Sequence, residues 1–127
     1  MDTLKIYPLV TPLSIHTDAC TKAQLIMEAK CQDYASTEDP FRNFRQIEAM
    51  DLGSVEVGII IRMGDKLSRL AGFAKDGDLA VKDESVEDTC LDLINYTIIL
   101  MAAIRSREAQ RRCAETDDTC MSDCGGW

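Results

Sequence analysis

An acidic run at residues 83–92 leads directly into the apolar stretch Leu93–Leu100, and this transition constrains the fold more than any other feature of the chain. Glu84, Asp88 and Asp92 recur at every fourth position, so on a helix they form one stripe of carboxylates. Like charges at this spacing repel by roughly 0.2–0.5 kcal/mol per pair unless a cation screens them. The sequence therefore predicts a long helix with one buried face and an acidic stripe beside it.

Two interpretations of the acidic stripe remain open. Acidic residues interact favourably with the dipole at a helix N-terminus, and this accounts for Asp83, Glu84 and Glu87. It does not account for Asp92, which lies two turns further along the helix. Hard carboxylate ligands suit Mg²⁺ or Mn²⁺, which bind one or two carboxylates together with substrate phosphates. The stripe is therefore a candidate metal site as well as a solvated helix end.

Size and charge set the outer limits. We expect one domain at residues 1–112 and an acidic, cysteine-containing tail at 113–127, in a chain of 127 residues that is small enough to gain from oligomerisation. The net charge of −8 disfavours tight binding to duplex DNA, which relies on neutralising many phosphates, but it allows a small nucleotide. The sequence has neither a signal-peptide pattern nor about 18 uninterrupted apolar residues. We therefore expect a cytoplasmic protein with no membrane partner.

The first half of the chain predicts one long helix and one short helix. Thr17 and Thr21 are candidate N-caps of a helix that continues to about Tyr34. The residues before Pro40 break the helical pattern, because a residue that precedes proline avoids the helical region. Residues 41–50 then predict a helical turn or two.

The second half predicts two further long helices. Ser54 is the candidate N-cap of a helix that ends near Lys75, and Asp83 is the candidate N-cap of a helix that continues to about Arg112. The face of the first that we expect in the core comprises Ile59, Ile60, Met63, Leu67, Leu70, Ala71 and Ala74. The corresponding face of the second comprises Val86, Cys90, Leu93, Ile94, Thr97, Ile98 and Met101. The predicted fold is all-α: a compact bundle of three long helices plus a short helix, completed by oligomerisation.

The six cysteines fall into two groups. Three occupy helical positions and are predicted to be buried free thiols: Cys20, Cys31 and Cys90. Three lie in the tail, with a spacing that fits no standard zinc site: Cys113, Cys120 and Cys124.

A charged stripe on the helix at 54–75 is a second candidate for chemistry: Arg62, Asp65, Lys66 and Arg69. At spacings of three and four residues these side chains can form ordinary surface ion pairs. If the stripe packs against the acidic stripe instead, Asp65 could complete a metal site and the cations could hold phosphates. Both interpretations remain open.

Residues 39–45 form a third candidate, because two phenylalanines alternate with polar side chains. Arg42, Asn43 and Arg45 could bind a phosphate while the aromatic rings stack on a base. The alternative is a loop whose Phe41 and Phe44 simply anchor in the core, and we favour that role for the two phenylalanines.

Four ordered blocks carry a resemblance to a known family. They are Lys-x-x-Asp-Tyr-Ala at 30–35, Asp-Pro-Phe-Arg-Asn-Phe at 39–44, Glu-Val-Gly and Met-x-Asp-Lys-Leu-x-Arg within 56–69, and Lys-Asp-Glu-Ser-x-x-Asp-Thr-x-x-Asp-Leu-x-x-Tyr at 82–96. Residues 20–102 thereby resemble the phage family called nucleotide modification associated domain 1. That family looks like a branch of the all-α nucleoside triphosphate pyrophosphatases, the MazG and dimeric dUTPase group.

The resemblance implies a magnesium-dependent (or manganese-dependent) enzyme that hydrolyses a (deoxy)nucleoside triphosphate to the monophosphate and pyrophosphate. It also implies a homodimer or homotetramer in the host cytoplasm. By position, the implied metal ligands are Asp65, Glu84, Asp88 and Asp92, with Glu84 and Glu87 as catalytic carboxylates. The substrate-binding candidates are Lys30, Asp33, Tyr34, Arg42, Asn43, Arg45, Arg62, Lys66, Arg69 and Tyr96. The alternative functions are a non-catalytic, sequestering nucleotide-binding protein and a phage protein that antagonises a host factor.

Overall fold

The computed structural model describes residues 10–33, 39–77 and 85–116, and within these ranges it contains helices and no strand. The predicted all-α fold of three long helices plus a short helix is confirmed. The elements are α1 (Pro12–Asp33), a 3₁₀ turn η1 (Arg42–Phe44), α2 (Arg45–Ala49), α3 (Val55–Asp76) and α4 (Val86–Glu115).

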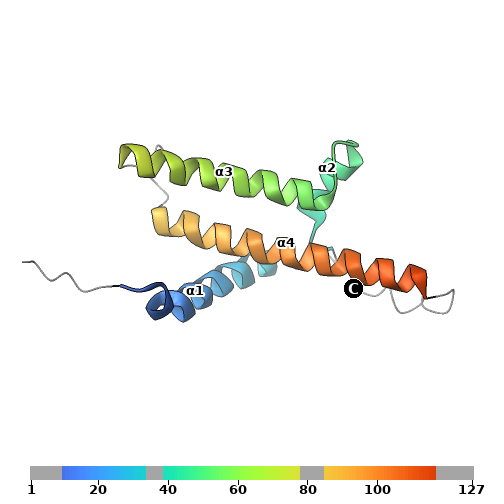
Figure 1. Cartoon of the computed structure of the whole chain (residues 1–127), viewed down its shortest axis with the longest axis horizontal. Helices are drawn as coiled ribbons and strands as arrows, with labels where there is room; N and C mark the ends of the chain where they lie inside the picture. The colour runs from blue at the N-terminus through green and yellow to red at the C-terminus, as the bar shows by residue number, and fades with distance from the viewer. Residues whose placement is uncertain (1–9, 34–38, 78–84, 117–127) are drawn as a thin grey trace, which may run out of the picture.

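The long helix α4 is the centre of the arrangement. Figure 1 shows α3 running antiparallel along one side of α4, with α1 on the other side and α2 beside the N-terminal end of α3. Within the described ranges α4 contacts both α1 and α3, whereas the backbones of α1 and α3 do not contact each other. Two flanking helices therefore reach each other only through side chains that meet on α4.

Local hydrogen bonds explain where the helices begin. Thr11 and Ser14 cap α1 reciprocally, because each backbone N–H donates to the hydroxyl of the other at 3.2 Å. Pro12 occupies the first helical position, where its fixed φ is favourable. The prediction of N-caps at Thr17 and Thr21 is therefore wrong: both residues lie inside α1, and the Thr21 hydroxyl donates to the Thr17 carbonyl at 2.8 Å.

The other two long helices have equally defined ends. The prediction that Ser54 caps α3 is confirmed, since its side chain accepts the backbone N–H of Val57, and Gly77 closes the helix at φ 75°. The N-cap of α4 is Ser85 and not the predicted Asp83, which lies outside the described residues. Ser85 and Asp88 form a capping box there, in which each side chain accepts the other's backbone N–H.

A small core joins η1, α3 and α4. Its buried residues are Phe41, Phe44, Val55, Ile59 and Ala103. Partly buried hydrophobic residues pack around them: Met63, Tyr96, Ile99 and Leu100. The two phenylalanines therefore anchor in the core, as we favoured from the sequence.

The predicted core faces of the long helices are only partly correct. On α4 the buried residues are Thr89, Leu91, Asn95 and Ala103, whereas Cys90, Thr97, Ile98 and Met101 are exposed. On α3 Ile59 is buried and Met63 and Leu70 are half-buried, but Ile60, Leu67, Ala71 and Ala74 are exposed. Both helices are rotated relative to the prediction, because α4 has to offer one side to α1 and another to α3.

The cysteine prediction also needs correction. Cys20, Cys31 and Cys90 are free thiols, but they are exposed and not buried, while Cys113 is disulfide-bonded.

Within the described residues α4 is long and apolar enough to cross a membrane, judged by length and composition alone. The core helices of soluble proteins pass the same test.

Candidate functional site

Asp92 of α4 forms ion pairs with one lysine of α1 and one lysine of α3. From α3, the Lys66 ammonium lies 2.9 Å from one carboxylate oxygen of Asp92, and from α1 the Lys30 ammonium lies 3.4 Å from the other. The spacing of these residues along three separate helices gives no indication of this contact. The structure thus brings together three residues that the sequence nominated for two different roles, metal binding and substrate binding.

Burial makes this triad unlike an ordinary surface ion pair. The side chains of Asp92 and Lys66 are only 16% and 13% exposed, whereas that of Lys30 is 60% exposed. Burial disfavours the charged form of Asp92, but the hydrogen bond from Lys66 and the positive charges of Lys30 and Lys66 outweigh it and hold its pKa below the ordinary 3.8. Asp92 is therefore a largely buried anion held between two cations where α1, α3 and α4 meet.

Asn95 lies one turn beyond Asp92 and ties α4 to α1. Its side-chain amide donates to the backbone carbonyl of Ala23 at 2.9 Å, and Ala23 itself is fully buried. The side-chain oxygen of Asn95 is buried and accepts no hydrogen bond from the part of the chain that the structure describes. The sequence did not identify this residue, although an asparagine inside the apolar stretch Leu93–Leu100 is the kind of signal that could have done so, because buried polar groups need partners.

The predicted metal ligands that the structure describes, Asp65, Asp88 and Asp92, do not gather into one cluster of carboxylates. Asp65 is exposed on α3, and the Asp88 carboxylate accepts hydrogen bonds from the backbone N–H and hydroxyl of Ser85 at 3.2 and 2.8 Å. Among the described residues no group of three or more His, Cys, Asp or Glu side chains could hold a metal ion. Glu84, which was nominated both as a ligand and as a catalytic carboxylate, lies outside the described residues. Asp92 is the described predicted ligand that pairs with both Lys30 and Lys66.

The remaining site candidates on α1, α3 and α4 lie outside the Asp92 triad. Glu87 is 69% exposed and pairs with Lys22 of α1 at 3.6 Å. Arg62 and Arg69 are exposed on α3, on the stripe that also carries Lys66. Asp33 ends α1, and Tyr34 lies outside the described residues.

The predicted phosphate-binding block at 39–45 lies elsewhere. Arg45 pairs with Asp39 and, at 3.5 Å, with Glu48, while Arg42 and Asn43 are exposed. The Arg45 hydrogen bond holds the pKa of Asp39 below its ordinary value, against the opposing effect of burial and with help from the Phe41 N–H. These side chains stabilise the turn that leads into α2.

Within one chain Arg45, the arginine at the end of this block, lies well beyond the Asp92 triad along α4. Arg45 lines a small hollow together with residues 103–110 of α4, which begin eleven residues beyond Asp92. At about 1.5 Å per helical residue, the two sites are separated by at least roughly 16 Å along the helix. Tyr96 points into the core between them, where its ring packs edge-to-face against Phe44 with centroids 6.4 Å apart. Arg45 and Lys66 therefore do not act on the same phosphate group in one chain.

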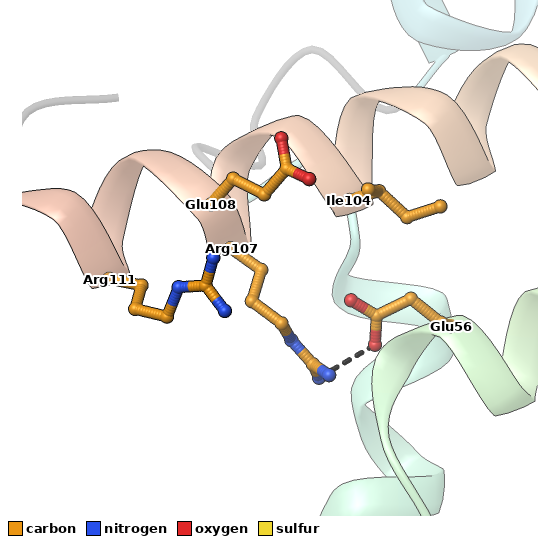
Figure 2. Close-up of a pocket in the computed structure, with 5 residues that line it drawn as sticks. All are labelled: Glu56, Ile104, Arg107, Glu108 and Arg111. Carbon is orange, nitrogen blue, oxygen red and sulfur yellow. Dashed lines mark ion pairs between the residues drawn. The ribbon is translucent and has the colours of Figure 1, made fainter.

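A hollow of about 320 Å³ lies between α3 and the C-terminal half of α4, lined by Glu56, Ile104, Arg107, Glu108 and Arg111. Figure 2 shows these five side chains. Arg107 reaches across it to Glu56 at 2.7 Å, and the Glu56 side chain is only 15% exposed. This pair joins the first turn of α3 to α4 and was not foreseen from the sequence. The net charge of the Glu56–Arg107 pair is zero, whereas the Asp92 triad has a net positive charge because two lysines pair with one carboxylate.

Comparison of the chain with protein-family models, with curated proteins and with solved structures finds no match. The chemistry therefore has to be argued from the triad itself. A metal ion can replace the two lysines as the partner of the Asp92 carboxylate. The released ammonium groups can then bind the oxygens of a phosphate. Among the described residues, the triad of Asp92, Lys30 and Lys66 is the best candidate for such a function.

Proposed function

We propose that this chain binds a magnesium–nucleoside triphosphate at the triad of Asp92, Lys30 and Lys66 and hydrolyses it to the monophosphate and pyrophosphate. The observation that carries the proposal is the convergence of Lys30 and Lys66, from two different helices, on a half-buried carboxylate of a third. The resemblance of residues 20–102 to the phage nucleotide modification associated family points to the same chemistry.

Charge balance supports a metal-bound nucleotide as the ligand. The triad alone carries a net charge of about +1, and a divalent cation on Asp92 would raise it to about +3, close to what a triphosphate neutralises. Mg²⁺ typically uses one or two protein carboxylates and fills its remaining positions with water and phosphate oxygens, so Asp92 suffices as one ligand. Lys30 and Lys66 would then leave the carboxylate and bind the phosphates.

The residues of the chain have separate roles in this proposal. The bound metal would supply charge neutralisation and a more acidic water. Glu87, or Glu84 outside the described residues, would accept the proton of that water as its oxygen bonds to the α-phosphorus. The bond from the α-phosphorus to the bridging oxygen then breaks, and Lys66 and Arg69 stabilise the negative charge on the departing pyrophosphate.

The test is a pyrophosphate-release assay with a panel of NTPs and dNTPs, with Mg²⁺ or with EDTA. We expect turnover only with Mg²⁺, a loss of at least roughly 100-fold for Asp92→Asn, and a clear loss for Lys30→Gln, which removes one phosphate-binding cation. The matched control is Lys75→Gln, an exposed lysine at the end of α3, which should keep the wild-type rate. A folded Asp92→Asn variant with an unchanged rate would falsify the assignment.

A non-catalytic nucleotide-binding protein is the second candidate. Both carboxylate oxygens of Asp92 already pair with lysines, and Asp88 already belongs to the capping box of α4. These acids therefore have structural roles without a metal, which favours the second candidate. The same panel separates the two functions. Saturable nucleotide binding by calorimetry that is lost in Lys30→Gln, without pyrophosphate release, supports the sequestering protein.

A further inference from the structure

The C-terminal half of α4 has an exposed face on the side away from α3. The side chains of Glu87, Asp92 and Asn95 bond to α1, and all three lie in the N-terminal half of α4, whereas Figure 1 shows the C-terminal half extending beyond α1. Five exposed residues recur there at alternating steps of four and three, so they share one side of the helix and form what we call the C-terminal stripe: Ile98, Ala102, Arg105, Ala109 and Arg112. At 3.6 residues per turn the stripe lies nearly opposite Leu100 and Ala103, which pack in the core.

Charge distinguishes this end of α4 from the chain as a whole. Residues 104–112 contain four arginines and one glutamate, a net charge of +3, in a chain whose net charge is −8. Arg107 pairs with Glu56, and Arg111 lines the hollow beside that pair, whereas the other two arginines belong to the C-terminal stripe. The stripe therefore combines apolar side chains with two cations, which suits an acidic segment that also carries an apolar side chain.

Cys113 shows where such a segment is attached. It lies one turn beyond Ala109 and is half-buried, whereas the other residues of 107–116 are exposed. Cys113 is disulfide-bonded and the three other described cysteines are free, so within one chain its partner is Cys120 or Cys124, both outside the described residues. Either disulfide returns the chain to the last turns of α4, at one end of the C-terminal stripe.

We propose that residues 117–127 of the same chain cover the C-terminal stripe, held at one end by the Cys113 disulfide. This segment contains three aspartates and no basic residue, so its charge of −3 complements the arginines of the stripe. Trp127 supplies a large apolar side chain for the apolar residues of the stripe. The stripe excludes Lys30, Lys66 and Asp92, so the inference does not rest on the proposed function.

The reach of the segment agrees with this placement. The helix from Ile98 to Cys113 is about 23 Å long at about 1.5 Å per residue. An extended chain covers about 3.3 Å per residue, so the residues from Cys120 to Trp127 can span about 23 Å and those from Cys124 to Trp127 about 10 Å, beyond Ala109 in both cases. The disulfide also gives the segment a high effective concentration at the stripe, so contacts too weak to hold a separate molecule suffice.

The fluorescence of Trp127 tests the placement, because the chain contains one tryptophan. A background that cannot exchange disulfides with the free thiols carries Cys20→Ser, Cys31→Ser and Cys90→Ser. In this background the folded, oxidised protein should emit at shorter wavelength than in urea, and acrylamide should quench it less, because the indole packs against the stripe. Emission and quenching equal to those in urea overturn the proposal.

A matched pair of alanine variants tests which surface the segment covers. Ala109→Glu places a carboxylate between Arg105 and Arg112, where it competes with the aspartates of the segment, so the emission should shift towards the urea value while far-UV circular dichroism stays helical. Ala71→Glu is the control, because Ala71 is also exposed within a long helix but lies on α3, and it should leave the emission unchanged. Equal shifts for the two folded variants overturn the proposal.

The disulfide and the charges are tested in the same background. A dithiol reduces the disulfide to two thiols while it is itself oxidised to a disulfide, and both this treatment and Cys113→Ser should shift the emission towards the urea value. NaCl at about 1 M should act in the same direction, because it screens exposed charges. Emission that neither reduction nor Cys113→Ser changes overturns the proposal. Short-wavelength emission that is lost on dilution also overturns it, because the segment would then cover a second copy. Should Ala109→Glu not fold, the Cys113→Ser result decides.

Discussion

Replacing Asp92 with asparagine should destabilise the fold by about 2 kcal/mol. Removing one partner of a fully buried ion pair costs about 3–5 kcal/mol, because the remaining charge is left uncompensated. Lys66 is 13% exposed and would be that charge, while the more exposed Lys30 can return to water. The partial access of solvent at the Lys30 side lowers the expected loss to about 2 kcal/mol, near the value of a hydrogen bond between charged groups.

The measurement is urea unfolding of wild-type and Asp92→Asn protein, followed by circular dichroism at pH 7. For a chain of this length about 2 kcal/mol corresponds to a decrease in Tm of roughly 8 °C. Glu87→Gln is the matched control, because its pair with Lys22 at 3.6 Å is 69% exposed on the Glu87 side and should contribute less than about 0.5 kcal/mol.

A double-mutant cycle makes the test specific. Adding Lys66→Met to Asp92→Asn removes the stranded charge, so the double variant should recover part of the loss, with a coupling of roughly 1–2 kcal/mol between the two positions. A stability of Asp92→Asn within about 0.5 kcal/mol of wild type, or no coupling with Lys66→Met, refutes the claim that this pair holds α3 on α4.

Two further predictions concern pH and capping. The pKa values of Asp92 and Asp39 are lowered in the folded state, so their contribution to stability is fully present above the ordinary pKa of 3.8 and is lost as the pH falls below it through the folded pKa values. Urea midpoints from pH 7 to 2.5 should therefore fall steeply below pH 3.8, and less steeply for Asp92→Asn; parallel curves contradict the assignment. Ser85→Ala should cost about 1 kcal/mol because it removes the N-cap of α4, whereas exposed Ser68→Ala should be nearly neutral. An equal effect of the two serine variants in urea unfolding speaks against the cap.

The elements that the sequence predicts well are those fixed by local chemistry. Ser54 and Gly77 delimit α3 through a side-chain cap and a left-handed residue, and both effects act within one turn of the helix. The start of α1 was missed because Thr11, Ser14 and Pro12 form a capping arrangement upstream of the predicted one. Alternative caps a few residues apart are hard to rank from sequence, since Thr11–Ser14 and Thr21–Gln24 offer the same kind of local cap and the residues between them are mostly exposed.

The site was predictable only in its parts. The stripe that contains Asp92 and the stripe that contains Lys66 follow from helical spacing, but their meeting depends on the crossing of three helices. The block at 39–45 was assigned to the same ligand because it is charged and aromatic. Its arginine is instead committed to Asp39 and Glu48, at a level of α4 far beyond Asp92.

The rotation of α3 about its own axis determines which of its apolar residues are buried. The apolar pattern of α3 is wide enough for the helix to turn either the side of Ile59 or the side of Ile60 towards α4, because both sides carry large aliphatic residues. The Lys66–Asp92 ion pair is satisfied only when Lys66 faces α4, and this rotation buries Ile59 and leaves Ile60 exposed. The half-buried ion pair thus decides which apolar residues of α3 are buried against α4 and which remain exposed.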